Sequence, residues 1–415
     1  MSSKPTLFTP LTLPCGAVMP NRIGKAAMEE NMAEVNQLPG AGLINLYQQW
    51  AKGGAGLLLT GNVMVDGSAM TGPGGIVLEH GTDLNPFRLW AAAGKQNGGQ
   101  LWMQINHPGR QTYAKLGGKR LAPSPVALDM GKHSALFGQP KAMDDSDINE
   151  VIARFAETAK LAEQAGFDGV QIHAAHGYLL SQFLSPLSNQ RTDQWGGVLA
   201  NRARLLCEVV KAVRAVVSPG FAVAVKLNSA DFQRGGFDDA DALGVLTLLN
   251  ELPVDLIELS GGSYESPAMQ GRTADGRTLA REAYFLEFAA ELAKVARMPL
   301  MTTGGIRRRQ VAEQVLAQGV AVAGMGTALA VEPNLPSLWQ AGQDASAELP
   351  PINWQDKVMA AVATMALTRR QLQRLGRNQR PKPNSSPALA LLLDQLRLAG
   401  LTRRYRRWLA QRNAA

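Results

Sequence analysis

The sequence predicts an α/β fold, a (β/α)8 TIM barrel followed by a basic helical extension. Short apolar runs alternate along the chain with longer segments whose apolar residues recur every three or four positions, about eight times in all. Such strict alternation of strand and helix implies a parallel sheet. About eight such units within about 340 residues favour a closed barrel over an open sheet.

The expected strands are short apolar segments. They are Arg22–Ala27, Gly56–Gly61, Gln100–Asn106, Gly169–His173, Ala222–Asn228, Leu256–Ser260, Leu300–Thr303 and Val320–Met325. Between them, segments such as Ile148–Ala165 and Arg202–Val217 have the apolar spacing of amphipathic helices. An open, doubly wound sheet is the alternative, although no Gly-x-Gly-x-x-Gly motif follows the first strand.

The composition excludes several classes of protein. The chain has 415 residues, 46% of them hydrophobic, and lacks any run of about 18 apolar residues, so no membrane span is expected. Its N-terminus lacks the charged-then-apolar layout of a signal peptide, and a cytoplasmic enzyme is expected. Cys15 and Cys207 are the only cysteines and lie far apart, which excludes a thiolate-held iron–sulfur cluster. No metal site is expected.

The positive charge of the chain is concentrated in its tail. The net charge is +8, yet from Arg369 onward there are twelve Lys and Arg residues against one acid, Asp394. The tail therefore carries +11 and the rest of the chain −3. We expect residues 1–345 to form the barrel and residues 346–415 to form a helical, Arg-rich extension.

This extension divides into three parts. Val358–Leu375 and Ala388–Gln411 have helical patterns, and a break rich in Pro, Asn and Ser at Arg380–Pro387 separates them. The last part mixes leucines with arginines, as in a basic amphipathic helix. We expect it to pack on the barrel or on a neighbouring subunit of a homo-oligomer, with nucleic acid or lipid as the alternative ligands.

The segment Ile172–Gly197 carries the first chemical signal. Its apolar run ends at His173, and His176 and Tyr178 follow within five positions. Two imidazoles can donate hydrogen bonds to one oxygen, and a phenol can deliver a proton to a carbanion. Two structural histidines, or a metal pair, are the alternatives, but no third ligand is obvious.

The ends of the expected strands share a second signal, since nearly all of them are polar or glycine. The residues there include Ala26, Ala27, Met28 and Glu29; Thr60, Gly61 and Asn62; Gln104, Asn106 and His107; His173 and His176; Lys226 and Asn228; Ser260–Gly262; Thr303–Gly305; and Gly324–Thr327. Chemistry in a barrel occurs at these ends. The pattern indicates one large, polar, planar ligand across the mouth.

The stretch HAAHGYLLSQFLSPLSNQRTDQWGG closely resembles the Old Yellow Enzyme family of FMN-dependent ene-reductases. The resemblance covers roughly residues 5–345. It implies that NADPH or NADH reduces FMN and that an electron-poor alkene, an α,β-unsaturated carbonyl or nitro compound, is then reduced at its C=C bond in a ping-pong reaction. It implies that His173 and His176 bind the substrate oxygen, with Asn106 nearby, and that Tyr178 donates a proton to the α-carbon.

The resemblance also implies the cofactor contacts. Gln104 and Lys226 align with the flavin-contacting amide and the basic residue of the family, and Lys226 can stabilise negative charge on the reduced ring. Backbone amides at Gly304-Gly305 and Gly326-Thr327 would hold the phosphate. The remaining expected flavin contacts are Ala26, Ala27, Met28 and Gly61.

Two positions depart from the family pattern. Thr327 stands where many relatives have Arg, and Arg307 or Arg308 could supply the missing charge. Glu29 stands where relatives often have Cys or Thr beside the flavin. An ionised Glu29 near the flavin would disfavour its anionic reduced form, unless the side chain points away or is protonated.

A second class of enzyme is the alternative to an ene-reductase. Flavin barrels that reduce uridine in tRNA carry basic RNA-binding parts, and the tail here could play that role. Those enzymes generally use a Cys as proton donor, and no Cys ends an expected strand in this chain.

Overall fold

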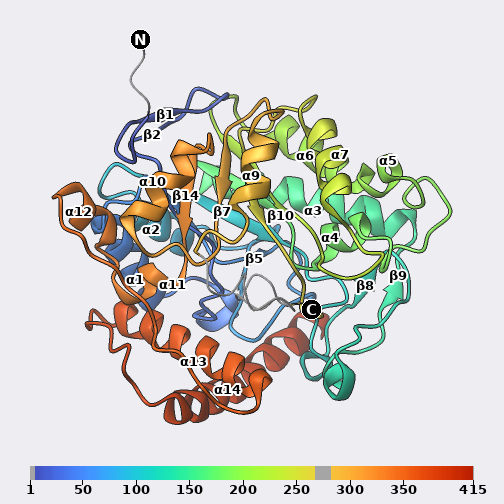
Figure 1. The fold of residues 1–415 in the computed structure, drawn as a ribbon. Coiled ribbons are helices and arrows are strands. Elements are labelled where there is room, and N and C mark those ends of the chain that lie inside the picture. The colour runs from blue at the N-terminus through green and yellow to red at the C-terminus, as the bar shows by residue number, and fades with distance from the viewer. Residues whose placement is uncertain (1–4, 267–281, 415) are drawn as a thin grey trace.

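The computed structural model describes residues 5–266 and 282–414 (Figure 1). Within them, a ring of parallel strands closes because the last strand pairs with the first. The barrel strands are β3 (Ile23–Lys25), β4 (Leu57–Leu59), β7 (Gln100–Asn106), β10 (Gly169–Ala174), β11 (Ala222–Asn228), β12 (Leu256–Ser260), β13 (Leu300–Thr302) and β14 (Val322–Met325). This closure confirms the predicted barrel, and the open-sheet alternative is wrong because the ring has no edge.

Helices surround the barrel. They are α1 (Ala41–Lys52), α2 (Asn85–Gly94), α3 (Asp145–Gln164), α4 (Leu179–Leu184), α5 (Leu199–Arg202), α6 (Arg204–Val216), α7 (Asp239–Leu249), α9 (Leu286–Ala293), α10 (Arg309–Ala317), α11 (Thr327–Val331) and α12 (Leu335–Gln340). The helix expected at Ile148 begins earlier, because the Asp144 side chain accepts from the amide of Asp147 in a capping box. The segment expected as one helix from Arg202 is two helices, with a break at Ala203.

Short elements lie outside the barrel. They are the hairpin of β1 (Leu11–Thr12) and β2 (Val18–Met19), the loop strands β5 (Val63–Met64), β6 (Ile76–Val77), β8 (Leu121–Ala122) and β9 (Lys141–Ala142), and the 3-10 turns η1 (Val35–Gln37), η2 (Ala114–Leu116) and η3 (Gly131–Leu136). Two long loops after barrel strands, residues 66–80 and 114–139, contain β6, η2, β8 and η3.

The barrel interior changes from apolar to polar along the strands. Side chains alternate in and out of the barrel, so the inward column of β7 is Trp102, Gln104 and Asn106. Trp102 belongs to an apolar cluster with Ala222, Ala224 and other residues near the N-terminal ends of the strands. Because the polar members come later in each strand, they gather at the C-terminal mouth.

The C-terminal extension packs against its own barrel. Helices α13 (Lys357–Gly376) and α14 (Pro387–Ala414) lie together at the bottom of Figure 1, with α13 next to α1 and α11. The Tyr405 hydroxyl donates to the carbonyl of Gly67 at 3.0 Å. The Arg397 and Arg404 guanidinium groups donate to the carbonyls of Asn31 and Ala33. The extension therefore covers the loops that follow β3 and β4.

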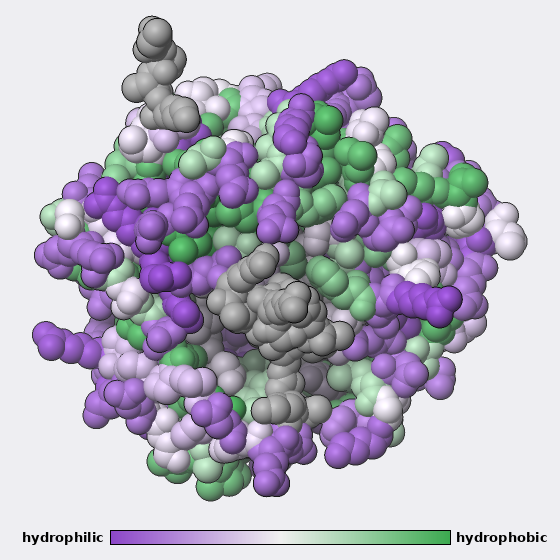
Figure 2. All heavy atoms as spheres, viewed as in Figure 1, coloured by the Kyte–Doolittle hydropathy of each residue, from purple (hydrophilic) through white to green (hydrophobic). Residues whose placement is uncertain are grey.

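One face of α14 stays uncovered. Figure 2 shows an apolar patch at the lower edge of the molecule, where Figure 1 has this hairpin. The exposed apolar side chains of α14 are Leu389, Leu392, Leu393 and Leu396. The expected homo-oligomer contact through the extension stays a prediction. Among the described residues, no helix is both long and apolar enough to cross a membrane.

Lys25 is a fully buried cation in the wall between β3 and α1. Its Nζ donates to the Leu59 carbonyl at 2.7 Å and to the Tyr47 hydroxyl at 3.1 Å, and it lies 3.6 Å from a carboxylate oxygen of Glu30. Burial lowers the pKa of Lys25 from 10.5 to about 8, although Glu30 acts in the opposite direction. The charged form therefore costs free energy in the folded state.

This lowered pKa predicts a pH-dependent stability. Between pH about 8 and 10.5 the unfolded chain keeps the lysine proton and the folded chain releases it, so the free energy of unfolding rises with pH. Lys25→Met should remove a rise on the order of 3 kcal/mol. Urea unfolding across this range, with exposed Lys294→Met as control, measures it. Parallel curves for parent and Lys25→Met would contradict the burial argument.

Candidate active site at the barrel mouth

Neighbouring strands hold the histidine segment in place. His173 ends the inward column of β10 and pairs in register with Lys226 on β11. Past the strand, His176 adopts a left-handed φ of 61°. Its amide donates to the side-chain oxygen of Asn228 at 3.1 Å, and its Nε2 lies 2.7 Å from the Ser260 hydroxyl. The ends of β11 and β12 thus fix the turn that presents His176.

The three side chains that the sequence singled out come together. The ring centroids of His173 and His176 are 5.0 Å apart, and those of His173 and Tyr178 are 4.8 Å apart. Both pairs are close to perpendicular, at 78° and 85°. No cluster of three or more potential metal ligands occurs among the described residues.

Both imidazoles are neutral. Burial, followed by the positive charge of Lys226, holds the pKa of His173 and of His176 well below 6.5. The Nδ1 of His173 accepts a hydrogen bond from the amide of Ala175 at 3.2 Å. The single proton of that neutral ring therefore sits on Nε2, which leaves an N–H to donate.

The Tyr178 phenol is protonated. Burial, and then the charge of Glu29, raises the pKa of Tyr178, while hydrogen bonding to Tyr264 and to the side chain of Asn62 acts in the opposite direction. The hydroxyls of Tyr178 and Tyr264 lie 3.1 Å apart. A protonated phenol with two polar neighbours can give up its proton and regain it from the hydrogen-bonded group beside it.

Tyr264 is held by an ion pair beneath the mouth loops. The next residue, Glu265, pairs with Arg110 at 2.6 Å, and both side chains are almost completely buried. The ring of Phe137 stacks on Tyr113 with centroids 4.8 Å apart and lies 6.0 Å from Tyr264. The rings of Tyr113 and Phe137 thus form one aromatic wall beside the phenols.

A buried chain of polar side chains crosses the barrel below the histidines. The Gln104 amide donates to Gln171 at 2.7 Å, and Gln171 donates to Glu258 at 2.7 Å. The other carboxylate oxygen of Glu258 lies 2.8 Å from the Lys226 Nζ. Glu258 thus orders Lys226 directly and orders Gln104 through Gln171. An amide and a cation are therefore held at neighbouring positions of the mouth.

Asn106 offers unused hydrogen-bonding capacity. Its side chain is completely buried, and neither its oxygen nor its nitrogen has a hydrogen-bond partner in the structure. Such groups are rare, because a buried polar group without a partner costs on the order of 1–3 kcal/mol. A ligand with a polar edge lying over Gln104 and Asn106 would remove that cost, so these residues fit the isoalloxazine ring of FMN.

The end of the first strand closely approaches that of the second. Ala26, Ala27 and Met28 follow β3, and Gly61 follows β4. A Cβ atom on Gly61 would lie 2.4 Å from the Met28 carbonyl oxygen, so this approach requires glycine. The predicted contacts from these residues fall on one side of the mouth, beside β14.

The predicted phosphate loops have backbone conformations that suit glycine. Gly304 and Gly305 have φ values of 113° and 73°, and the ring of Tyr284 packs against both. Gly326 precedes α11, which begins at Thr327. The structure thus places both predicted pairs at the ends of β13 and β14, the neighbouring strands that bring their amides to one side of the barrel.

Arg307 and Arg308, suggested as the missing phosphate charge, have other partners. Both contact Glu282, with Nε to carboxylate distances of 3.1 Å and 2.7 Å, and Arg307 also pairs with Glu348 at 2.5 Å. Both arginines are more than 40% exposed, at 44% and 57%. Either would have to leave Glu282 to meet a phosphate.

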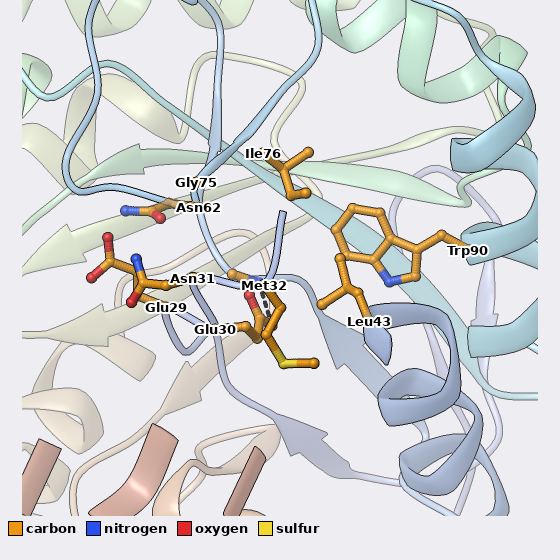
Figure 3. A pocket seen from close by; sticks show the side chains of 11 residues that line it. Glu29, Glu30, Asn31, Met32, Leu43, Asn62, Gly75, Ile76 and Trp90 are labelled. Carbon is orange, nitrogen blue, oxygen red and sulfur yellow. Dashed lines mark hydrogen bonds between the residues drawn. The ribbon is translucent and has the colours of Figure 1, made fainter. Parts of the chain in front are cut away.

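The Glu29 side chain points away from the apolar residues of the wall beside it (Figure 3). Figure 3 shows Glu29 and Asn62 pointing to the same side, away from Leu43 and Trp90. The small cavity that all four line has a volume of about 10 Å³, no more than one water needs. The cavity cannot hold a cofactor or substrate, so the site is the mouth itself.

Several residues of the site were not predicted. Gln171, Glu258 and Tyr264 are not among the residues predicted from the sequence, and Asn62 is predicted only as a strand-end residue. A signal for the first two exists in the sequence, because Gln171 is two positions before His173 and Glu258 is two before Ser260, so each shares the inward face of its strand. Tyr264 lies in a loop, where no periodicity marks it.

Comparison with known proteins assigns the barrel to a family. Residues 6–345 match the model of the NADH:flavin oxidoreductase / NADH oxidase family. An NADH-dependent flavin oxidoreductase of Neonectria sp. (strain DH2) is 42% identical over 79% of this chain, and the match spans 46% of that protein, less than half its length. One from Hypocrea jecorina (strain QM6a) is 36% identical over 79% of this chain and 87% of its own.

Solved structures share the fold. A 2-naphthoyl-CoA reductase in complex with 2-naphthoyl-CoA aligns with a TM-score of 0.75 and 25% identity, over 81% of this chain and 52% of that one. An old yellow enzyme homologue from Zymomonas mobilis gives a TM-score of 0.72 at 24% identity, over 83% of this chain and 95% of its own. The second likeness concerns the fold alone.

The neutral state of the histidine pair is open to test. The ring nitrogens of His173 and His176 should keep neutral ¹⁵N shifts from about pH 5.5 to pH 8, because burial and Lys226 oppose protonation. Histidine-labelled protein with free imidazole as internal standard provides the measurement. If either ring titrated over the same pH range as free imidazole, that ring would be more accessible to water than it is in the structure.

Proposed function

Because the chain belongs to the NADH:flavin oxidoreductase / NADH oxidase family, we propose that it is an ene-reductase with FMN as cofactor. Its substrate is an electron-poor alkene, an α,β-unsaturated carbonyl or nitro compound, reduced in a ping-pong cycle. The observation that carries the proposal is the grouping of two neutral imidazoles and a protonated phenol above a buried amide and cation. The relatives named NADH-dependent support NADH as reductant over NADPH.

The residues proposed to hold FMN surround the mouth. When bound, FMN would supply the hydride chemistry between the nicotinamide and the β-carbon of the alkene. Gln104 and Asn106 would present amides to the polar edge of the ring, and Lys226 would stabilise negative charge on the ring. Ala26–Met28 and Gly61 line one side, and the amides at Gly304-Gly305 and Gly326-Thr327 take the phosphate.

The histidine pair acts on the substrate oxygen. His173 can donate from Nε2, because its Nδ1 accepts from the backbone, and His176 is oriented by Ser260. Two N–H groups aimed at a carbonyl or nitro oxygen stabilise the enolate-like charge that develops during the reaction. Because both rings stay neutral, each donates a hydrogen bond from an N–H group. Neither ring takes up the proton that the α-carbon of the substrate receives.

Tyr178 supplies that proton. Its phenol is protonated and stands against the His173 ring, so it lies next to the substrate that His173 binds. The O–H bond breaks, the proton passes to the α-carbon, and the phenolate that remains can accept a proton through the Tyr264 hydroxyl, 3.1 Å away.

The RNA-reductase alternative has little support. The cysteine that such enzymes use is missing from the mouth, since Cys207 is on α6 and Cys15 packs at the opposite end of the barrel. Arg397 and Arg404 of the tail donate to carbonyls of the barrel, whereas Arg403, Arg406 and Arg407 are exposed. An ene-reductase therefore remains the better reading of the site.

Separating the two half-reactions tests this proposal. Tyr178→Phe should slow alkene reduction by about 100-fold or more while flavin reduction by NADH changes little, because only the second step needs the phenolic proton. Stopped-flow absorbance with NADH, then with cyclohexenone, measures both rates. Tyr264→Phe is the matched control and should have the smaller effect.

Equal slowing of both half-reactions would show that Tyr178 supports the site in some other way. A rate of alkene reduction unchanged in Tyr178→Phe would assign the proton to another group. Either result would remove Tyr178 from the proposed role.

A further inference from the structure

An arginine of the C-terminal extension reaches the mouth. Arg369, on α13, pairs with Glu29 across 3.8 Å and with Asp394 of α14 at 2.9 Å. Its side chain is 13% exposed, and that of Asp394 is 3% exposed. Glu29 is also fixed on its other oxygen by the Thr71 hydroxyl, which donates at 2.8 Å. The extension therefore has a charged contact with the loop after β3, in which the Glu29 side chain is 24% exposed.

The charges of this contact act on the phenols of the site. Glu29 raises the pKa of Tyr178, Tyr264 and Tyr113, in each case after burial. Arg369 opposes this rise at Tyr113. Glu29 and Asn62 point to the same side in Figure 3, and Asn62 interacts with the Tyr178 phenol. The ion pair thus belongs to the electrostatic surroundings of the proposed proton donor.

The hairpin does not need Arg369 to dock. Tyr405 donates to the Gly67 carbonyl, and Arg412 pairs with Glu79. Gly67 and Glu79 lie on the loops after β4. Arg404 donates to the Ala33 carbonyl. Anchoring of the hairpin to the barrel therefore does not explain why Arg369 lies beside Glu29 at the mouth.

We propose that Arg369 is a positioning residue of the active site, which the extension supplies to hold Glu29 and to neutralise its charge beside Tyr178. This inference rests on the proposed function, because Tyr178 matters only if the mouth reduces alkenes. The extension is then part of the site, and the pair between Arg369 and Asp394 links α13 to α14. The Arg369–Asp394 pair is mostly buried, so removal of one partner leaves the other charge poorly solvated.

The binding of a phenolate tests the proposal directly. p-Hydroxybenzaldehyde, added near pH 8 to the FMN-loaded protein, should bind as an anion over the flavin and produce a charge-transfer band. Arg369→Gln should weaken its binding by about tenfold, because Glu29 then acts without a counter-charge. Glu29→Gln should strengthen it, and the double variant should lie close to Glu29→Gln alone, as expected if Arg369 acts through Glu29.

Three further variants separate electrostatics from docking. Arg369→Lys keeps the charge and should restore most of the affinity. Asp394→Asn loosens the hairpin without removing the Glu29 pair, so it should lower the unfolding temperature and change affinity by less than about twofold. Arg407→Gln, at an exposed position of α14, should change neither the unfolding temperature nor the affinity.

Several results would overturn the inference. One is an unchanged Kd in Arg369→Gln; another is an equal loss in the Glu29→Gln background, which would mean that Arg369 acts independently. If Arg369→Gln does not fold, an unchanged Kd for p-hydroxybenzaldehyde in Glu29→Gln would overturn the inference instead. A parent protein that takes up FMN but neither binds the phenol nor reduces an alkene would instead reject the proposed function.

Discussion

The register of four neighbouring strands decides what the mouth of this barrel can do. Gln171 is opposite Gln104, His173 is opposite Lys226, and Lys226 is opposite Glu258. Side chains at one level of a closed barrel face each other across a short distance, so this pairing links amides, carboxylate and ammonium into one buried chain. A shift of one residue in any strand would turn these groups outward, against the helices. The polar chain costs desolvation, and its arrangement is explained by a ligand that uses the amide and the cation together.

The extension adds charge to a site that the barrel already shapes. The net charge of +11 from Arg369 onward left nucleic acid open as an alternative partner, yet Arg369, Arg397 and Arg404 bind a carboxylate and two carbonyls of the mouth loops. Those loops follow β3 and β4, and they carry Glu29, Asn31 and Gly67. Basic residues in a tail can therefore serve the chain's own acids and carbonyl groups. The exposed leucines of α14 show that the hairpin still has a free face, on which a second copy of the chain could pack.

Much of the barrel could be predicted from the sequence, because its strands are buried on both faces and its helices carry periodic apolar stripes. His173, His176 and Tyr178 could be predicted as a group, since their short spacing after a strand leaves few ways to separate them. The ion pairs could not, because their partners are far apart in the chain: Glu29 lies 340 residues from Arg369, and Arg110 lies 155 residues from Glu265. For the same reason the sequence left the orientation of Glu29 open, and the partner of Lys226 was not identified.

The central claim is that the mouth binds a flavin, whose polar edge meets Gln104, Asn106 and Lys226. The most direct measurement is the visible absorption spectrum of the purified protein, recorded anaerobically before and after NADH and again after an enone is added. The purified protein should show the spectrum of bound oxidised flavin, NADH should bleach it, and the enone should restore it. A colourless protein that does not take up FMN on reconstitution would contradict it.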